Sequence, residues 1–191
     1  LSFKSSDDIL TDPLSLRGLT FANYERVLGG LPLGQMYLNT IIIASVSVVI
    51  GATVSYMLAF ALTRMVFRRR GVRAAIQYYV LAGISIPVFI LLFPVYRLDL
   101  ALGIFGTYWA LILPYTALTI PFTTLVFMGF LSDFPGELEE AAVIDGAGLW
   151  TVCVRVVLPL MRPVIATVFI LNTVFVFNEF AFASILINDP D

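Results

Sequence analysis

Four long apolar stretches, separated by short polar segments, dominate the pattern of this chain. They cover residues 38–63, 74–96, 107–132 and 163–187, and the first three contain no charged residue. About 20 apolar residues are enough for a helix to cross a bilayer. A single apolar segment satisfies its own backbone hydrogen bonds in lipid only as a helix. The pattern therefore predicts an all-α polytopic membrane protein with four spans.

Prolines and small residues distinguish the predicted spans. Proline removes a backbone hydrogen bond, so kinks are expected in the second and third spans, at Pro87, Pro94, Pro114 and Pro121. Small residues favour close contact between membrane helices. The first span carries such a face at Gly51, Ala52 and Ser55.

The distribution of positive charge predicts the orientation. Five of the eleven basic residues lie in segment 64–73, namely Arg64, Arg68, Arg69, Arg70 and Arg73. The positive-inside rule places this loop in the cytoplasm. A patch for nucleic acid or anionic lipid is the less favoured interpretation, because the position of the arginines at a span end already accounts for them. Alternation then predicts external segments at 1–37, 97–106 and 188–191, and a second cytoplasmic segment at 133–162.

Segment 133–162 is polar and has its own helix signals. Pro135 suits the first turn of a helix, and the helix dipole favours the glutamates that follow it. Gly146 is a good C-terminal stop, and any side chain there is expected to tilt the loop. Such a helix is short enough to be marginal in water and needs a surface to pack on. A second short helix is predicted over residues 149–158.

Composition excludes several classes of function. The 191 residues are 60% hydrophobic and 13% charged, with a mean hydropathy of +0.97, which is far from the composition of soluble domains. The chain has no histidine, and its single cysteine, Cys153, allows no internal disulfide. No phosphate-binding glycine-rich loop is present, so ATP would have to be held by another chain. No catalytic constellation is visible, which makes a membrane enzyme the least favoured class.

Segment 133–162 also matches a known signature at fixed spacing. The matching positions are Glu140, Ala141, Ala142, Gly146, Val156, Leu158 and Pro159. They resemble the EAA signature of permease subunits of ABC importers. Asp145, Ala147 and Trp150 are common choices in that family, whereas Cys153 stands where many relatives carry phenylalanine. Further stretches resemble the carbohydrate, maltose-transporter-type branch, at 102–107, 113–115, 120–122 and 177–180.

The resemblance implies a fold, a mechanism and partners. It implies a type I ABC importer transmembrane fold, of which this chain holds four of an expected six spans, with one helix before residue 1 and one after residue 191. It implies alternating access in the cytoplasmic (inner) membrane of a bacterium or archaeon. The implied partners are an ATPase dimer that binds ATP and Mg, a second and different permease subunit, and an extracytoplasmic solute-binding protein. No cofactor, metal or nucleic acid is expected on this chain itself.

The resemblance places ATPase docking on the loop, at Glu140, Ala141, Ala142, Asp145, Gly146 and Ala147. In the family, the glutamate matching Glu140 pairs with a basic residue of the ATPase. The plainer alternative is a solvated glutamate that only complements the helix dipole.

A substrate-pathway role is considered for four residues, Glu179, Asn178, Asn172 and Tyr115. Glu179 is the one charged residue inside a predicted span, and such residues mark functional sites by default. The alternative for Glu179 is a structural contact with Asn178 or with a neighbouring helix. Aromatic residues of the spans are expected to face lipid or to pack.

Two other classes of function stay open. A gradient-driven secondary transporter usually needs ionisable residues near the membrane midplane, and here only Glu179 is available. A non-transporting scaffold subunit could use the same loop to bind partners without moving any solute.

Overall fold

The computed structural model describes residues 2–4, 9, 11, 14–15, 19–133 and 135–187. The chain divides into two compact units, Leu1–Ile41 and Ile42–Asp191. Every regular element within the described residues is a helix.

The first unit contains helix α2, Ala22–Gly30, and the beginning of α3, Leu33–Arg64. A small aromatic cluster joins Phe3, Phe21 and Tyr24, with ring centroids 5.2–6.3 Å apart. The Asn23 side chain donates hydrogen bonds to the backbone carbonyls of Ser2 and Lys4 at 3.1 and 2.8 Å.

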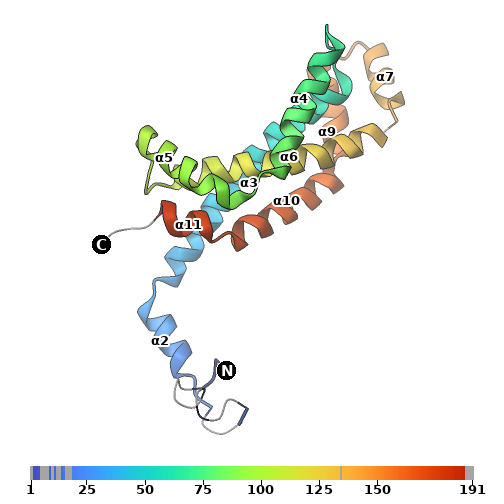
Figure 1. The fold of residues 1–191 in the computed structure, drawn as a ribbon. Coiled ribbons are helices and arrows are strands. Elements are labelled where there is room, and N and C mark those ends of the chain that lie inside the picture. Colours follow the sequence, from blue (N-terminus) through green and yellow to red (C-terminus); the bar gives the residue numbers. More distant parts are fainter. Residues whose placement is uncertain are drawn as a thin grey trace. The chain divides into compact units, whose positions relative to one another are not determined.

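The second unit is built on two long helices, α3 and α6, Tyr108–Asp133 (Figure 1). Both are long and apolar enough to cross a membrane. They correspond to the predicted spans 38–63 and 107–132. Pro114 and Pro121 lie inside α6, which continues through both positions.

Small residues bring α3 and α6 close together. Gly51 faces Thr119 so closely that a Cβ atom on Gly51 would lie 2.6 Å from the Thr119 hydroxyl oxygen. One turn away on the same face, the Ser55 hydroxyl donates to the Ile120 carbonyl at 3.3 Å. Ala52 is buried beside Gly51. The predicted small-residue face is therefore the face that contacts α6.

The predicted span 74–96 is not one kinked helix. Helix α4, Arg70–Ala82, leads into the 3-10 turns η1, Gly83–Ser85, and η2, Val88–Leu91, and then into α5, Leu92–Leu102. The two helical halves meet at 98°. Pro87 lies at this break with an extended backbone, whereas Pro94 lies in the first turn of α5, where its missing N–H has no intrahelical partner to lose. The expected kink at Pro94 is therefore wrong.

The last part of the chain is also more broken than the pattern predicted. Short helices α7, Glu137–Ile144, and α8, Leu149–Thr151, precede a π-helical stretch η3, Val152–Val157, and α9, Leu158–Leu160. Helix α10, Arg162–Asn178, follows at 72° to the preceding helical run. The predicted span 163–187 ends early as a continuous helix, because Glu179 is extended and a separate helix α11, Ala181–Leu186, begins after it.

Two apolar clusters hold the second unit together. One joins α3 and α6 to η3 and the start of α10, around Tyr56, Phe127 and Met161. The other joins α3 and α6 to α11, around Tyr115, Phe182 and Leu186. Figure 1 shows α7 near one end of this bundle and α5 and α11 near the other. Ala142 and Ala147 of the polar loop pack against the first cluster, which therefore supports the loop.

The close approach of α3 and α6 yields a first test. Gly51→Val is expected to destabilise the protein by about 1–3 kcal/mol, because the added methyl groups overfill a packed contact. Thermal unfolding in detergent measures the effect. Gly129→Val is the matched control, since a Cβ at Gly129 meets no atom within 4 Å. Equal stability of the two variants would contradict the contact.

Candidate functional site

Helix α7 begins and ends as the sequence dictates. Three glutamates, Glu137, Glu139 and Glu140, occupy its first turn, where the helix dipole stabilises negative charge. The helix ends at Ile144, and Asp145 and then Gly146 follow it. The φ of Gly146 is +85°, in the left-handed region that favours glycine. Here the Gly146 N–H donates to the Val143 carbonyl at 3.0 Å, and the Ala147 N–H donates to the Ala142 carbonyl at 2.9 Å. These two bonds form a Schellman motif, which fixes the direction of the chain after α7.

The six residues assigned to docking do not share one surface. Glu140, Ala141, Asp145 and Gly146 are exposed. Ala142 and Ala147 are half-buried and pack against the cluster around Tyr56 and Phe127. The exposed residues are available to a partner, whereas the two alanines seat the loop on the bundle.

Apolar residues surround the exposed acidic positions. The large apolar side chains that α7 and α8 leave exposed are Leu138, Val143, Ile144, Leu149 and Trp150. Ile144 is 85% exposed and Trp150 is 66% exposed. A groove of about 580 Å³ runs between this surface and the end of α3. Val143, Ile144 and Leu149 line this groove. Exposed apolar surface of this kind is typical of a protein–protein contact.

The helical run after Gly148 contains one π-helical stretch, for which Pro159 gives a physical reason. In a regular α-helix, the Pro159 ring would clash with the carbonyl of Arg155, four residues earlier. The wider turn of η3 instead lets the Leu158 N–H bond to the Cys153 carbonyl, five residues back. Cys153 is buried in the cluster around Tyr56, and its Sγ donates a hydrogen bond to the Tyr56 hydroxyl oxygen at 3.5 Å. The predicted second helix over 149–158 is therefore present in a locally widened form.

Two side chains of α3 attach to the loop, and the sequence analysis missed both. The Tyr56 hydroxyl donates to the Cys153 carbonyl at 2.6 Å. Arg64 Nε donates to both carboxylate oxygens of Glu139, at 2.8 and 2.9 Å. The partners lie 97 and 75 residues apart along the chain, and no local periodicity connects them. The one available signal was that Arg64 closes an uncharged span beside an acidic loop on the same predicted side.

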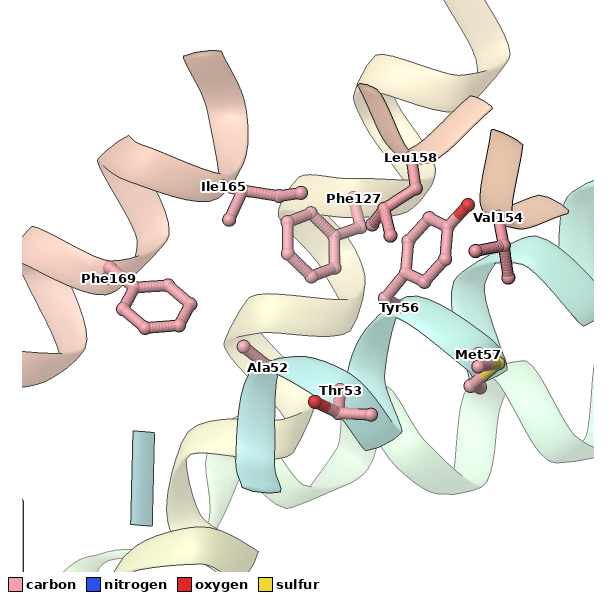
Figure 2. Close-up of a pocket in the computed structure, with 9 residues that line it drawn as sticks. All are labelled: Ala52, Thr53, Tyr56, Met57, Phe127, Val154, Leu158, Ile165 and Phe169. Carbon is pink, nitrogen blue, oxygen red and sulfur yellow. The ribbon is translucent and has the colours of Figure 1, made fainter. Parts of the chain in front are cut away.

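A small apolar cavity lies beside Tyr56 (Figure 2). It has a volume of about 140 Å³. Figure 2 shows side chains of α3 and α6 meeting those of η3, α9 and α10 around it. The Tyr56 hydroxyl points toward the segment that carries Val154 and Leu158. This end of α3 is therefore packed directly against the helical run Leu149–Leu160.

The four residues assigned to the substrate pathway fall into three different environments. Tyr115 and Glu179 are joined, since the Tyr115 hydroxyl donates to Glu179 Oε2 at 2.7 Å. The same carboxylate accepts the Phe182 N–H at 3.1 Å and so caps α11. Asn172 is buried and donates to the Thr123 hydroxyl oxygen at 2.9 Å. Asn178 is exposed and donates to the Val174 carbonyl of its own helix.

These contacts do not bring the four residues into one site. Glu179 joins α6, α10 and α11, which matches the structural alternative considered for it. No group of three or more Cys, Asp or Glu side chains gathers as a metal site in the part of the chain that the structure describes.

Comparison with curated proteins finds close relatives along the whole chain. The permease NgcG of the diacetylchitobiose uptake system of Streptomyces coelicolor is 35% identical over 191 residues, covering 100% of this chain and 62% of the relative. The trehalose/maltose transport permease MalG of Thermococcus litoralis is 34% identical, covering 99% of this chain and 68% of the relative. The chain thus spans about two thirds of the length of these relatives.

Comparison with solved structures supports the fold. A bacterial ABC transporter involved in import of the acidic polysaccharide alginate matches with a TM-score of 0.77 at 22% identity. The match covers 98% of this chain and 65% of that one. The likeness confirms the predicted all-α polytopic membrane fold, the type I ABC importer transmembrane fold, of which this chain holds a part.

A family comparison identifies the same group of proteins. Residues 51–191 match the family described as the inner membrane component of binding-protein-dependent transport systems. The match covers more than half of the chain and includes both the loop with α7 and the residues around Glu179. The chain belongs to the family of inner membrane components of binding-protein-dependent transport systems.

Proposed function

We propose that the chain is part of the permease subunit of an ATP-driven importer that takes up a carbohydrate by alternating access. Membership of the family supports the transport role, and the names of the relatives, which include diacetylchitobiose and trehalose/maltose systems, support a carbohydrate as the solute. In this proposal the chain is a translocation component rather than an enzyme. ATP and Mg bind to separate ATPase subunits.

One observation carries the proposal. Helix α7, whose C-terminal end is fixed by a Schellman turn, presents exposed acidic and apolar residues beside a groove. Glu140 is exposed, and the neighbouring Val143 and Ile144 extend an apolar surface along α7. The Schellman turn at Gly146 fixes the orientation of this surface relative to the following helix. A compact element of this kind transmits a rigid-body motion better than a flexible linker does.

The proposed assembly contains three kinds of partner. An ATPase dimer docks on α7 and its flanking turn at Glu140, Ala141, Asp145 and Gly146. A second, different permease subunit completes the pathway, and an extracytoplasmic solute-binding protein delivers the sugar. The assembly lies in the cytoplasmic membrane of a bacterium or archaeon. The family description and the apolar helices support the membrane location.

The contacts of Glu179 weigh against a secondary transporter. A proton-carrying carboxylate must exchange partners during the transport cycle. Here the Glu179 carboxylate already accepts bonds from Tyr115 and from the first turn of α11. We assign Glu179 and Tyr115 to holding the break between α10 and α11 in place, so any influence on the pathway is exerted through its shape.

Reversing the charge at Glu140 tests docking. Glu140→Lys is expected to reduce recovery of the ATPase with a tagged, full-length permease at least about ten-fold, because like charges across an interface cost several kcal/mol. Co-purification from detergent-solubilised membranes measures the effect. Glu137→Lys, which reverses an exposed charge in the same helical turn, is the matched control. Undiminished recovery with Glu140→Lys would contradict docking at this residue.

Replacing Gly146 tests the orientation of the loop. A β-branched side chain in the left-handed region costs about 1–2 kcal/mol, so Gly146→Val should distort the Schellman turn. We expect the variant to insert in the membrane but to lose most of its transport. Gly148→Val is the control, because Gly148 is extended at φ −74° and a Cβ there meets no atom within 4 Å. Wild-type uptake by Gly146→Val, or equal losses in both variants, would refute the role of this turn.

The energy source separates the two transporter classes. In proteoliposomes containing the complete transporter, uptake from a panel of chitobiose-, trehalose- and maltose-type sugars should require internal ATP. Uptake should not respond to an uncoupler, either in the wild type or in Glu179→Gln. Uptake that continues without ATP and collapses with the uncoupler would favour the secondary transporter. Partner binding without any uptake would favour the scaffold subunit.

A further inference from the structure

One face of α3 contacts the loop at three successive turns. Tyr56, Phe60 and Arg64 are spaced four residues apart and therefore lie on one side of the helix. Tyr56 bonds to η3, Phe60 lies between, and Arg64 bonds to α7. These three residues form the α3 joint face.

The contact that Tyr56 of the α3 joint face makes with Cys153 is buried. Tyr56 is almost completely covered, and its hydroxyl donates to the Cys153 carbonyl at 2.6 Å. That carbonyl already accepts the Leu158 N–H of the widened turn. The bond thus links α3 to the π-helical stretch of the helical run Leu149–Leu160.

The contact that Arg64 makes with Glu139 is a half-buried ion pair. The side chains of Arg64 and Glu139 are 20% and 13% exposed, and the Arg64 Nε meets both carboxylate oxygens. Arg64 is the last residue of α3, and Glu139 lies in the first turn of α7. Phe60 packs between the two contacts, in the same cluster as Val152.

Helix α7 packs on η3 and leaves most of its own surface exposed. Of its eight residues only Glu139 and Ala142 are half-buried, and the other six are exposed. Neighbouring glutamates therefore point to different sides: Glu139 faces α3, whereas Glu140 is exposed. An eight-residue helix is marginal by itself in water, so its position depends on such anchors.

We propose that the α3 joint face is the element that transmits movement of the docked loop to α3, with Arg64, Glu139 and Tyr56 as positioning residues. The inference rests on the proposed function, because it presumes that a partner moves α7. The docking residues Glu140, Ala141, Asp145 and Gly146 hold the partner. The pair Arg64–Glu139 converts displacement of α7 into displacement of α3. Loss of the pair should leave docking intact and weaken the link between ATP hydrolysis and transport.

The test uses the complete, reconstituted transporter. Arg64→Gln, Glu139→Gln and the swapped double variant Arg64→Glu/Glu139→Arg are compared with wild type in two measurements. The first is co-purification of the ATPase, and the second is the number of sugar molecules taken up per ATP hydrolysed, with the sugar that the wild type transports best. Arg73→Gln and Glu137→Gln are the controls, since they remove exposed charges on the same side of the protein.

We expect each single variant to retain the ATPase and to lower the transport-to-hydrolysis ratio by about two-fold or more, the lower end of couplings between contacting residues. The swapped variant should recover most of the ratio, and the controls should keep it. A purely structural role would lower protein yield or both activities together without changing the ratio. Tyr56→Phe, which keeps the buried ring and removes only the hydroxyl, should lower the ratio in the same direction.

The outcomes separate the inference from the proposed function. A wild-type permease that retains no ATPase would overturn the proposed function and the joint with it. Suppose that the wild type binds the ATPase but Arg64→Gln, Glu139→Gln and Tyr56→Phe all keep the wild-type ratio of sugar uptake to ATP hydrolysis. That result would overturn only the role of the α3 joint face. Loss of ATPase binding in the single variants would also overturn it, because the pair would then belong to the docking surface.

Discussion

The short helix α7 cannot hold its position by its own hydrogen bonds, so its position depends on contacts with the neighbouring helices. Eight residues form too few backbone bonds to offset the cost of helix nucleation in water. The Schellman turn at Gly146 supplies one constraint, and the half-buried pair of Arg64 and Glu139 supplies another. Ala142 and Ala147 add apolar contact with the bundle. A loop attached in this way can move as a rigid body together with the end of α3.

The break between α10 and α11 is stabilised by a side chain that hydrogen-bonds the freed backbone groups. Irregular backbone at membrane depth is tolerated only where other groups replace the lost bonds. At the end of α10 the Glu179 carboxylate accepts the free N–H groups at the start of α11, and Tyr115 stabilises that carboxylate. The charge that seemed a candidate for the pathway is thereby used to close a break. Its contacts also explain why α10 and α11 can form two helices within one apolar stretch.

The sequence predicted the parts of the fold that depend on local pattern. The uncharged runs located α3 and α6, the small residues around Gly51 located the contact between them, and Gly146 located the end of α7. The 98° break around Pro87 was expected only as a kink, because proline signals a lost hydrogen bond but not the angle that neighbouring packing imposes. The Arg64–Glu139 pair joins residues 75 positions apart. Neither hydropathy nor a motif reports such a contact, since it exists only once α3 and α7 have been placed in space.

In the proposed assembly the exposed face of α7 meets an ATPase subunit. The most direct measurement places a photoreactive amino acid at Ala141, which is exposed beside Glu140, in the full-length permease of an assembled transporter. Illumination should join the permease to the ATPase, and the same group placed at exposed Ile170, on the apolar helix α10, should not form this product. With the ATPase present and active, crosslinks from Ala141 only to lipid or to other permease segments would contradict docking of the ATPase on α7.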